Sequence, residues 1–497
     1  MLGEILAFVL YFLAMLAVGA YFMFKKKAKT QSDYFLGGRA MGPYVTALSA
    51  QASDMSSWLL MGLPGSIVAV GFGEVWIAIG LAIGTYLNWL LIAGRLRKFS
   101  QAAGDAITIP QYLNNRFKAK GKTLQIVSAV IFFVFFTVYV ASILKGGATL
   151  FDSVLGVNNQ IVSMIIFTVI LLAYTFMGGF NAVCWTDLIQ SLLMLVAITF
   201  IPLSFIIGGQ ADLSVTATGG SFNLLSSGRF DWASISTILN GLAWGLGYCG
   251  MPHIIIRFMS IKNSKMVKTS RRVASVWVVI TLAMAVLVGL VGASVMPELV
   301  TNGQHESVFI LLARKALPPF LAGICMSAIL AASMSTADSQ LLVASSAVAC
   351  DIYKPIVKKD ASENEVLWVG RIVIVLISII AFVIASIPAL GNIMDLVSYA
   401  WAGFGGAFGP VIVLSLFWKK LTYKGAVTGM IVGGLTVILW ILFLSGPTGV
   451  YELIPAFILG LLACIVVSII DKKNVAPCEE MFNEAIAFDD SVEQVKG

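Results

Sequence analysis

The sequence predicts an all-α polytopic membrane protein with thirteen transmembrane helices. Of the 497 residues, 59% are hydrophobic and only 11% are charged, whereas soluble proteins carry about 25% charged residues. The apolar stretches are long and continuous, which favours helices over the alternating strands of a membrane β-barrel. At about 20 residues per crossing, apolar runs of spanning length begin near residues 3, 44, 74, 124, 160, 184, 233, 273, 317, 366, 392, 425 and 451.

The basic residues predict the orientation of these helices. An odd number of crossings places the termini on opposite sides of the membrane, and Lys and Arg accumulate in cytoplasmic connections. With the N-terminus outside, 28 of the 32 Lys and Arg residues fall in cytoplasmic segments. We therefore expect a cytoplasmic C-terminus, whose acidic residues after Glu479 form a solvated helix or a disordered tail. The first apolar run, Ile5 to Phe24, precedes three lysines rather than a cleavage site, so we expect it to remain as an anchor.

Composition and motifs exclude several classes of function. The six cysteines lie mostly within apolar segments without short paired spacings, which argues against disulfides and zinc. The connections are too short to hold a catalytic domain, and the sequence has no GxxxxGK(S/T), HExxH or GxSxG motif. The net charge of +7 is explained by the cytoplasmic connections and does not indicate nucleic-acid binding. We therefore expect neither an enzyme nor an ATP-driven pump.

The second predicted span, residues 44–71, places small polar residues and a carboxylate at a depth where lipid favours Leu and Val. Asp54 lies among four serines in this span. A carboxylate at the centre of a bilayer costs about 2.5–3.5 kcal/mol on insertion scales, so it needs a partner, a cavity or an ion. Asp54 is therefore predicted to bind a ligand. The alternative is that it caps a helix break or bonds neighbouring hydroxyls.

The seventh span, residues 240–258, combines several glycines with Pro252, which predicts an interrupted helix. Non-helical backbone at this depth is tolerated where it lines a cavity, and interrupted helices in two repeats point to a transporter's central site. Spans two and seven are five apart, and two consecutive five-helix units have opposite orientations, as in an inverted repeat. The alternative is close packing of glycine-rich helices, which explains the glycines but not Pro252 beside Trp244 and Tyr248.

The ninth span gathers oxygen-bearing side chains in an otherwise apolar stretch, namely Ser333, Ser335, Thr336, Asp338 and Ser339. A hard cation such as sodium is bound by several oxygen ligands, and hydroxyls together with freed carbonyls supply them without adding charge. Any single hydroxyl could instead bond the carbonyl one turn earlier in its own helix. As a group beside a carboxylate, these residues predict a cation site.

Four segments together resemble one family of transporters. They read SAQASDMSSWLLMGLPG (49–65), WGLGYCGMPHIIIRFM (244–259), MSTADSQLLVASS (334–346) and VSYAWAGFGGAFGP (397–410). These segments resemble the sodium/solute symporter family and are most like its bacterial sodium/proline symporters. The resemblance extends from span two to span thirteen. It implies a LeuT-like core of two inverted five-helix repeats, and sodium-coupled uptake by alternating access across a bacterial cytoplasmic membrane.

The same resemblance implies five parts of the chain. These are a leading helix with its cytoplasmic loop (1–43), the first five-helix repeat (44–210), the second repeat with its preceding external loop (211–418), two trailing helices (419–471) and the acidic cytoplasmic tail (472–497). One leading and two trailing helices around ten core helices agree with the thirteen spans counted from hydropathy. Sodium is expected as the coupling ion and no organic cofactor is expected. The oligomeric state is left open.

The resemblance also implies a sodium site, which would use the carbonyls of Ala52, Met55 and Ala332 and the hydroxyls of Ser335 and Thr336. Asp54 resembles the acidic residue on which sodium binding depends in this family. Arg39, Ser49 and Ser56 occupy positions that the family uses for coupling and gating. Arg39 could instead be an ordinary basic residue of a cytoplasmic loop.

A substrate site is implied near Tyr139, Trp244, Tyr248 and Pro252. Aromatic rings suit the apolar ring of proline, and helix ends suit its carboxylate. Trp and Tyr in membrane helices are more often interface anchors or packing residues. Trp244 and Tyr248, however, are four residues apart beside the predicted break rather than at the end of a span.

A second cation site is a candidate at Asp187, Ser335, Asp338 and Ser339, as in some members of the family. Asp338 could equally pair with a base, for which Lys145 in span four is a candidate. Lys145 could instead extend toward the outer interface, and Asp187 could begin a helix at the cytoplasmic surface. The sequence therefore leaves the ratio of sodium to substrate open.

Together these features predict a secondary active transporter that takes up L-proline with sodium. The alternative cargo is another small amino acid, betaine or a monocarboxylate. Two alternatives from other classes are a channel and a transporter-like sensor. A channel would not need two interrupted helices around an occluded aromatic site, and a sensor would carry an attached signalling domain that the short tail does not supply.

Overall fold

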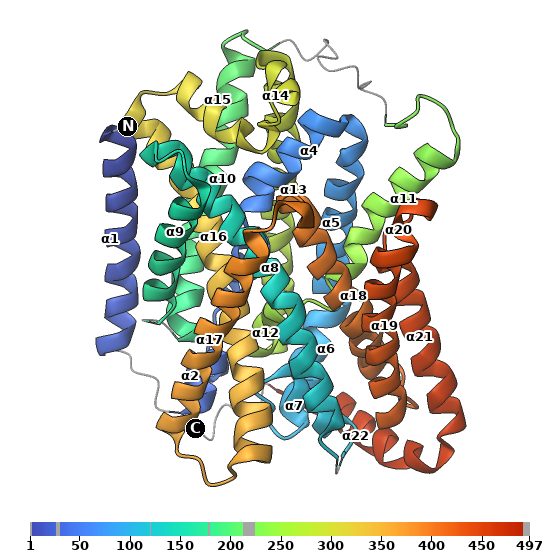
Figure 1. Ribbon diagram of the computed structural model, residues 1–497. Coiled ribbons are helices and arrows are strands. Elements are labelled where there is room, and N and C mark those ends of the chain that lie inside the picture. Colours follow the sequence, from blue (N-terminus) through green and yellow to red (C-terminus); the bar gives the residue numbers. More distant parts are fainter. Residues whose placement is uncertain (1, 26–29, 120, 177–178, 212–223, 491–497) are drawn as a thin grey trace.

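The computed structural model describes residues 2–25, 30–119, 121–176, 179–211 and 224–490, and over these residues the chain forms a bundle of helices without a named strand (Figure 1). Ten of its helices are long and apolar enough to cross a membrane. The predicted all-α membrane fold is therefore confirmed. Two interrupted helices and the shorter α9 occupy the three other predicted spans, so the number thirteen stays a prediction.

The first half of the bundle begins with a long helix and contains the first interrupted helix; short 3-10 or π-helical segments are labelled η. Its elements are α1 (Leu2–Lys25), α2 (Gln31–Leu36), η1 (Gly37–Arg39), α3 (Pro43–Asp54), η2 (Trp58–Gly62), α4 (Leu63–Val70), η3 (Phe72–Glu74), α5 (Val75–Leu87), η4 (Asn88–Ala93), α6 (Gly94–Ala102), α7 (Ile109–Arg116), α8 (Thr123–Leu155), α9 (Gln160–Thr175) and α10 (Phe180–Ile207).

The second half begins with the other interrupted helix and ends in a short helix of the tail. Its elements are α11 (Trp232–Gly247), α12 (Pro252–Ser260), η5 (Ser264–Met266), α13 (Val267–Val295), α14 (Glu298–Thr301), η6 (His305–Ser307), α15 (Val308–Ala316), α16 (Pro319–Val348), η7 (Ala349–Val357), α17 (Glu363–Ala385), η8 (Pro388–Leu390), α18 (Ile393–Phe417), α19 (Tyr423–Phe443), α20 (Ser445–Thr448), α21 (Leu453–Ile470), η9 (Lys472–Asn474) and α22 (Val475–Ala487).

Both interruptions that the sequence predicts are present. Helix α3 ends at Asp54, and the chain passes through Met55 into the π-helical η2. Helix α11 ends at Gly247, and α12 begins at Pro252. Proline suits this first helical position, because its missing N–H would have no partner there and its φ is already helical. The glycine-packing alternative alone therefore does not account for span seven.

The two interrupted helices lie where other helices surround them. Helix α3 contacts α10, α12, α13 and α16, and α8 contacts α16, α17 and α18. Every residue of α12 is buried. Helices α19 and α21 pack against each other and α18 at one edge of the bundle, while α1 packs against α16 and α10 at the other (Figure 1). The break in α3 is thus separated from lipid, as the bilayer requires of non-helical backbone.

The tail differs from the solvated or disordered segment that the sequence suggests. Helix α22 folds back against α6 and α7, and it buries Cys478, Met481 and Phe482. The ring centroid of Phe482 lies 5.3 Å from that of Phe99 on α6. Apolar residues at helical spacing between the glutamates give α22 the apolar face that docks here. Residues 491–497 of the predicted tail lie outside the described residues.

Helices α5 and α11 approach each other so closely that their glycines are required. A Cβ atom added at Gly84 would lie 2.4 Å from the Cα atom of Gly245, well inside van der Waals contact. Gly94, farther along the same continuous helical stretch, has open space around its Cβ position. Alanine substitutions at Gly84 and Gly94 therefore separate the effect of packing on stability from the effect of helix propensity.

We expect Gly84→Ala to lower the free energy of unfolding by about 1–3 kcal/mol, since overpacking costs this much. Gly94→Ala is the matched control, and it should leave stability unchanged or raise it by up to about 1 kcal/mol through helix propensity. The thermal unfolding midpoint of the purified protein in detergent measures both. Similar midpoints for the two variants would contradict the close approach.

Candidate functional site

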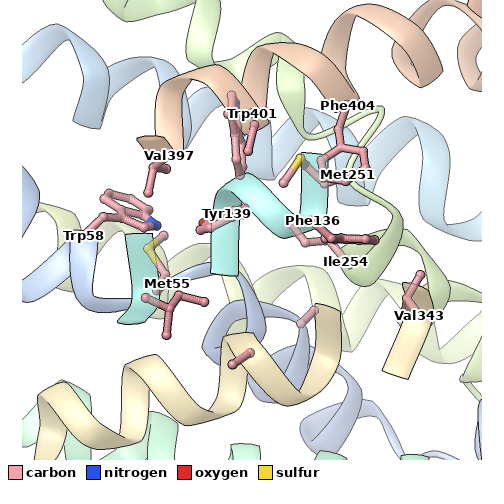
Figure 2. Close-up of a cluster of buried hydrophobic side chains, with 14 of the residues drawn as sticks. Met55, Trp58, Phe136, Tyr139, Met251, Ile254, Val343, Val397, Trp401 and Phe404 are labelled. Atoms are coloured by element: carbon pink, nitrogen blue, oxygen red, sulfur yellow. The ribbon is translucent and has the colours of Figure 1, made fainter. Parts of the chain in front are cut away.

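The breaks in α3 and α11 border a buried cluster of aromatic and apolar side chains. Figure 2 shows Trp58 from η2, Tyr139 from α8 and Trp401 from α18 in this cluster, together with Met251 from the α11–α12 break. All four side chains are buried. Aromatic rings in such a site offer large apolar surfaces, while their N–H and O–H groups need polar partners.

Asp54 supplies several of these partners. Its carboxylate oxygen Oδ2 accepts a hydrogen bond from the hydroxyl of Tyr248 at 2.6 Å. Its backbone carbonyl accepts hydrogen bonds from the Tyr139 hydroxyl at 3.2 Å and from Nε1 of Trp58 at 3.1 Å. The structure thus brings together Asp54, Tyr139 and Tyr248 from three helices. The other carboxylate oxygen, Oδ1, is buried and finds no hydrogen-bond partner among the described residues.

Trp401 connects the second break to the same cluster. Its Nε1 donates to the backbone carbonyl of Trp244 at 2.8 Å, and its ring lies edge-on to that of Tyr248, with centroids 5.1 Å apart. The ring of Trp244 also stacks on Tyr451, with centroids 5.5 Å apart. Trp244 and Tyr248 therefore both face α18. Trp401 lies in one of the segments that carry the family resemblance, but nothing in the sequence alone shows which rings meet, so no role for it could be predicted.

Pro252 begins α12 and is followed by a buried histidine that the sequence analysis did not assign. The His253 ring lies between Phe136 and Tyr139, with centroid distances of 5.7 and 6.1 Å. Neither ring nitrogen has a hydrogen-bond partner in the part of the chain that the structure describes. Buried polar atoms are normally paired, so these nitrogens, like Oδ1 of Asp54, mark places where a polar ligand or water can bind.

Four of the five predicted sodium ligands meet where α3 is interrupted. The Ser335 hydroxyl donates to the carbonyl of Ala52 at 2.7 Å, and the Thr336 hydroxyl lies 3.4 Å from the same oxygen. The Ser335 hydroxyl also lies 3.2 Å from the carbonyl of Ala332. Met55 follows the last residue of α3, with φ −85° and ψ 81°.

The local backbone explains why the carbonyl of Ala52 is free to accept these bonds. In a continuous helix it would accept from the N–H four residues later, that of Ser56. The N–H of Ser56 instead donates to the carbonyl of Asp54 at 3.1 Å. Because the hydroxyl of Ser56 also lies 3.4 Å from the N–H of Trp58, Ser56 holds the break from both sides. Only the backbone carbonyl of Asp54 takes part in this break, because its carboxylate bonds Tyr248 and does not cap η2.

A second polar group lies between α3, α10, α12 and α16, and it contains a buried ion pair. Arg257 lies 3.1 Å from the carboxylate of Asp187, and both side chains are almost fully buried. The Ser49 hydroxyl donates to Asp187 at 2.6 Å and lies 3.0 Å from Nε of Arg257. The guanidinium group also donates to the hydroxyl of Ser339. Three candidate residues thus meet around an arginine that the sequence analysis had not singled out.

The remaining candidates have other partners. The Asp338 carboxylate accepts a hydrogen bond from the hydroxyl of Thr175. Lys145, proposed as a base for Asp338, donates instead to the carbonyl of Gly391, in the loop before α18. Asp187 lies inside α10 and is not the residue that begins this helix. The pairing of Lys145 with Asp338 and the capping role of Asp187 are therefore wrong. Both rested on sequence position without knowledge of the facing helices.

Comparison with known proteins identifies the family. The model of the sodium:solute symporter family matches residues 34–433. The chain belongs to the sodium:solute symporter family. It is 44% identical to the osmoregulated proline transporter OpuE of Bacillus subtilis, over 95% of this chain and 96% of that protein. It is 42% identical to the sodium/proline symporter of Escherichia coli, over 97% of this chain and 96% of that protein.

Solved structures confirm the fold of this symporter. A sodium-coupled sialic acid symporter in a substrate-bound, outward-open state superposes with a TM-score of 0.77 at 21% identity, covering 94% of this chain and 98% of that one. The nucleobase-cation symporter Mhp1 superposes with a TM-score of 0.56 at 13% identity, covering 92% and 99% of the two chains. At these identities the likeness concerns the fold alone.

At the end of the symporter where α2 and α6 lie, at the bottom of Figure 1, two arginines bind backbone carbonyls. Arg39 has a left-handed φ of 52° and donates to the carbonyl of Met259 at 2.7 Å, while its Nε lies 2.6 Å from Asp105. Arg97 donates to the carbonyls of Ile261 and Lys262 at 2.6 and 3.0 Å. Arg39 is thus a buried residue that joins the loop before α3 to the end of α12.

We expect Ser335→Ala to raise the sodium concentration needed for half-maximal stabilisation of the protein about tenfold or more. The variant removes one of the oxygens around the Ala52 carbonyl, and a loss of about 1.4 kcal/mol in binding corresponds to a factor of ten. The measurement is the thermal unfolding midpoint in detergent, titrated with NaCl at constant ionic strength with KCl, because an ion that binds only the folded state raises stability.

Ser345→Ala is the matched control for this prediction. Ser345 is a buried serine on the same helix, α16, and among the described residues its hydroxyl bonds only the carbonyl of Leu342 in that helix, at 2.9 Å. Its substitution should leave the sodium titration unchanged. If Ser335→Ala and Ser345→Ala gave the same half-maximal sodium concentration as the unmodified protein, the site would be misplaced.

Proposed function

We propose that this symporter takes up L-proline together with sodium by alternating access. The observation that carries the proposal is the meeting of Ala52, Ser335 and Thr336 at the break in α3, next to the pairing of Asp54 with Tyr248. It is supported by relatives above 40% identity over nearly the whole chain that are named proline transporters and sodium/proline symporters.

Sodium would be held by neutral oxygens in this arrangement. Carbonyls and hydroxyls suit a hard cation, and here they come from both sides of the contact between α3 and α16. The Ser335 hydroxyl, which now donates to the Ala52 carbonyl, would turn its lone pairs toward the ion. Binding would then favour the conformation in which α3 and α16 are in contact. A ligand shifts a conformational equilibrium only through such a difference in affinity.

Proline would occupy the neighbouring aromatic cluster. Tyr139, Trp244, Tyr248 and Pro252 line the region between the two breaks together with Trp401. The rings suit the apolar part of a pyrrolidine, whereas the free Oδ1 of Asp54 suits its secondary ammonium group. Because Tyr248 also donates to Asp54, substrate and sodium would act on the same interrupted segment. This shared segment is the physical basis of coupling.

One sodium ion per proline is the ratio that the charges favour. The second candidate cation site contains Asp187 and Ser339, but Arg257 already neutralises the carboxylate and bonds the hydroxyl. A guanidinium group thus supplies the positive charge that a second ion would bring. One sodium crossing 100 mV releases about 2.3 kcal/mol and a tenfold gradient about 1.4 kcal/mol more, which together permit roughly 500-fold accumulation of a neutral zwitterion.

The end of the bundle that contains Arg39 and Arg97 is proposed to face the cytoplasm, with the N-terminus outside. The support is the excess of Lys and Arg in the connections at this end. Two single-cysteine variants on a cysteine-free background, Lys359→Cys for this end and Asn302→Cys for the other, test this. In intact cells a membrane-impermeant maleimide should label only the second. Labelling of the first alone would reverse the orientation.

The decisive test of the proposed function is uptake of labelled proline in proteoliposomes with simultaneous measurement of charge movement. An inward sodium gradient should drive accumulation with one positive charge per proline, and Asp54→Asn should abolish the sodium dependence. A gradient of potassium alone is the control and should give none. Equal accumulation with potassium would refute sodium coupling, whereas two charges per proline would refute the ratio. Competition by betaine, other small amino acids and monocarboxylates defines the range of cargo.

A further inference from the structure

Two adjoining hollows on the side of the bundle have the features of a lipid site. The first has a volume of about 540 Å³ and lies between α5 with η4 and α11. The second has a volume of about 510 Å³ and lies between η4 with α6, the end of α18 and α22. Leu91 and Phe417 line both hollows, so the two adjoin each other, and together they are called the groove.

The upper part of this groove is apolar and opens where the bilayer lies. The close approach of Gly84 to Gly245 forms its floor, and its rim includes the exposed side chains of Ile83, Leu87 and Leu246. An apolar groove on a membrane-facing surface is filled by hydrocarbon, since water gains no partners there. An acyl chain therefore fits this part by its chemistry.

The lower part is basic. Arg95 and Lys98 line it, and no carboxylate of the described residues lies within ion-pair distance of either. The guanidinium carbon of Arg95 lies 4.5 Å from the ring centroid of Phe417, and its buried Nε has no hydrogen-bond partner in the described part of the chain. Asp490, which is near Ser264 on the rim, accepts two hydrogen bonds from that residue. Arg95 and Lys98 can therefore bind an anion from outside the protein.

The apolar and basic parts of the groove lie close enough for one lipid molecule to reach both. Gly84 and Arg95 are eleven residues apart on the continuous helical stretch from Phe72 to Ala102, and at 1.5 Å per residue this spans about 16 Å. A lipid with its phosphate at Arg95 and one acyl chain along α5 therefore reaches the glycine contact. Arg95 also lies at the end of the bundle that carries the excess of basic residues, where anionic lipids gather in the cytoplasmic leaflet.

We propose that an anionic glycerophospholipid binds in this groove, with its phosphate on Arg95 and Lys98 and one acyl chain between α5 and α11. The site adjoins the substrate region from outside. Cys249 on the groove wall follows Tyr248, whose carbonyl accepts a hydrogen bond from Asn88 of η4 at 3.1 Å. The bound lipid supports the interrupted segment from the membrane side.

The test measures binding without transport, so its outcome is independent of the proposed cargo. The thermal unfolding midpoint of the full-length protein in detergent is titrated with dioleoyl phosphatidylglycerol and, separately, with dioleoyl phosphatidylcholine. We expect phosphatidylglycerol to act at a concentration at least tenfold lower. The double variant Arg95→Gln/Lys98→Gln should lose this preference, whereas Arg95→Lys/Lys98→Arg should retain it.

The control is Lys359→Gln/Lys420→Gln, which makes the same change of charge at two exposed lysines of other loops. It should keep the preference for phosphatidylglycerol. Equal potency of the two lipids on the unmodified protein would overturn the proposal, as would an undiminished preference in the Arg95→Gln/Lys98→Gln variant. In a further titration, inorganic phosphate at matched ionic strength replaces the lipid. Equal protection by phosphate alone would show a site for a free anion rather than a lipid.

Discussion

The arrangement of this protein depends on how backbone groups are satisfied inside the membrane. Hydrocarbon offers no hydrogen bonds, so a helix that is interrupted at this depth must find partners within the bundle. At the break in α3, the carbonyl of Ala52 finds them on α16, in the hydroxyls of Ser335 and Thr336. Side chains of α16 thus supply hydrogen bonds to a backbone carbonyl of α3. The same oxygens are the ligands that a dehydrated cation would use, so structural need and ion binding coincide.

Buried charges follow the same rule of internal compensation. Asp187 and Arg257 neutralise each other, and Ser49 and Ser339 bond this pair, although Oδ1 of Asp187 has no hydrogen-bond partner among the described residues. Removing one partner of such a pair leaves an uncompensated charge, which costs several kcal/mol. Asp54 differs, because its only side-chain partner among the described residues is a neutral tyrosine hydroxyl rather than a basic group. Between these two carboxylates, Asp54 is the one whose charge is available to a transported ligand.

Much of the fold could be predicted because the bilayer imposes simple rules on sequence. Hydropathy located the helices, and Pro252 with its neighbouring glycines located the second break. Asp54 and Ser335 stand out in the sequence as candidates because polar residues are rare at that depth. Partners on other helices could not be found in this way. Trp401 looks like any apolar aromatic residue in its own segment, and Arg257 looks like a loop arginine until α12 is seen to be buried.

The contacts of Arg39 and Arg97 with main-chain oxygens make this end of the molecule sensitive to insertions and deletions. The two arginines bind main-chain oxygens of residues 259–262, and Met41 pairs with the same segment through its own backbone. These contacts do not depend on the side chains of the segment, although Met259, Ser260 and Ile261 are themselves fully buried and contribute to packing. Deleting or inserting one residue would displace each carbonyl by roughly 3.5 Å and break the contacts together. Segment length is therefore a constraint at this end of the molecule in addition to the packing of the buried side chains.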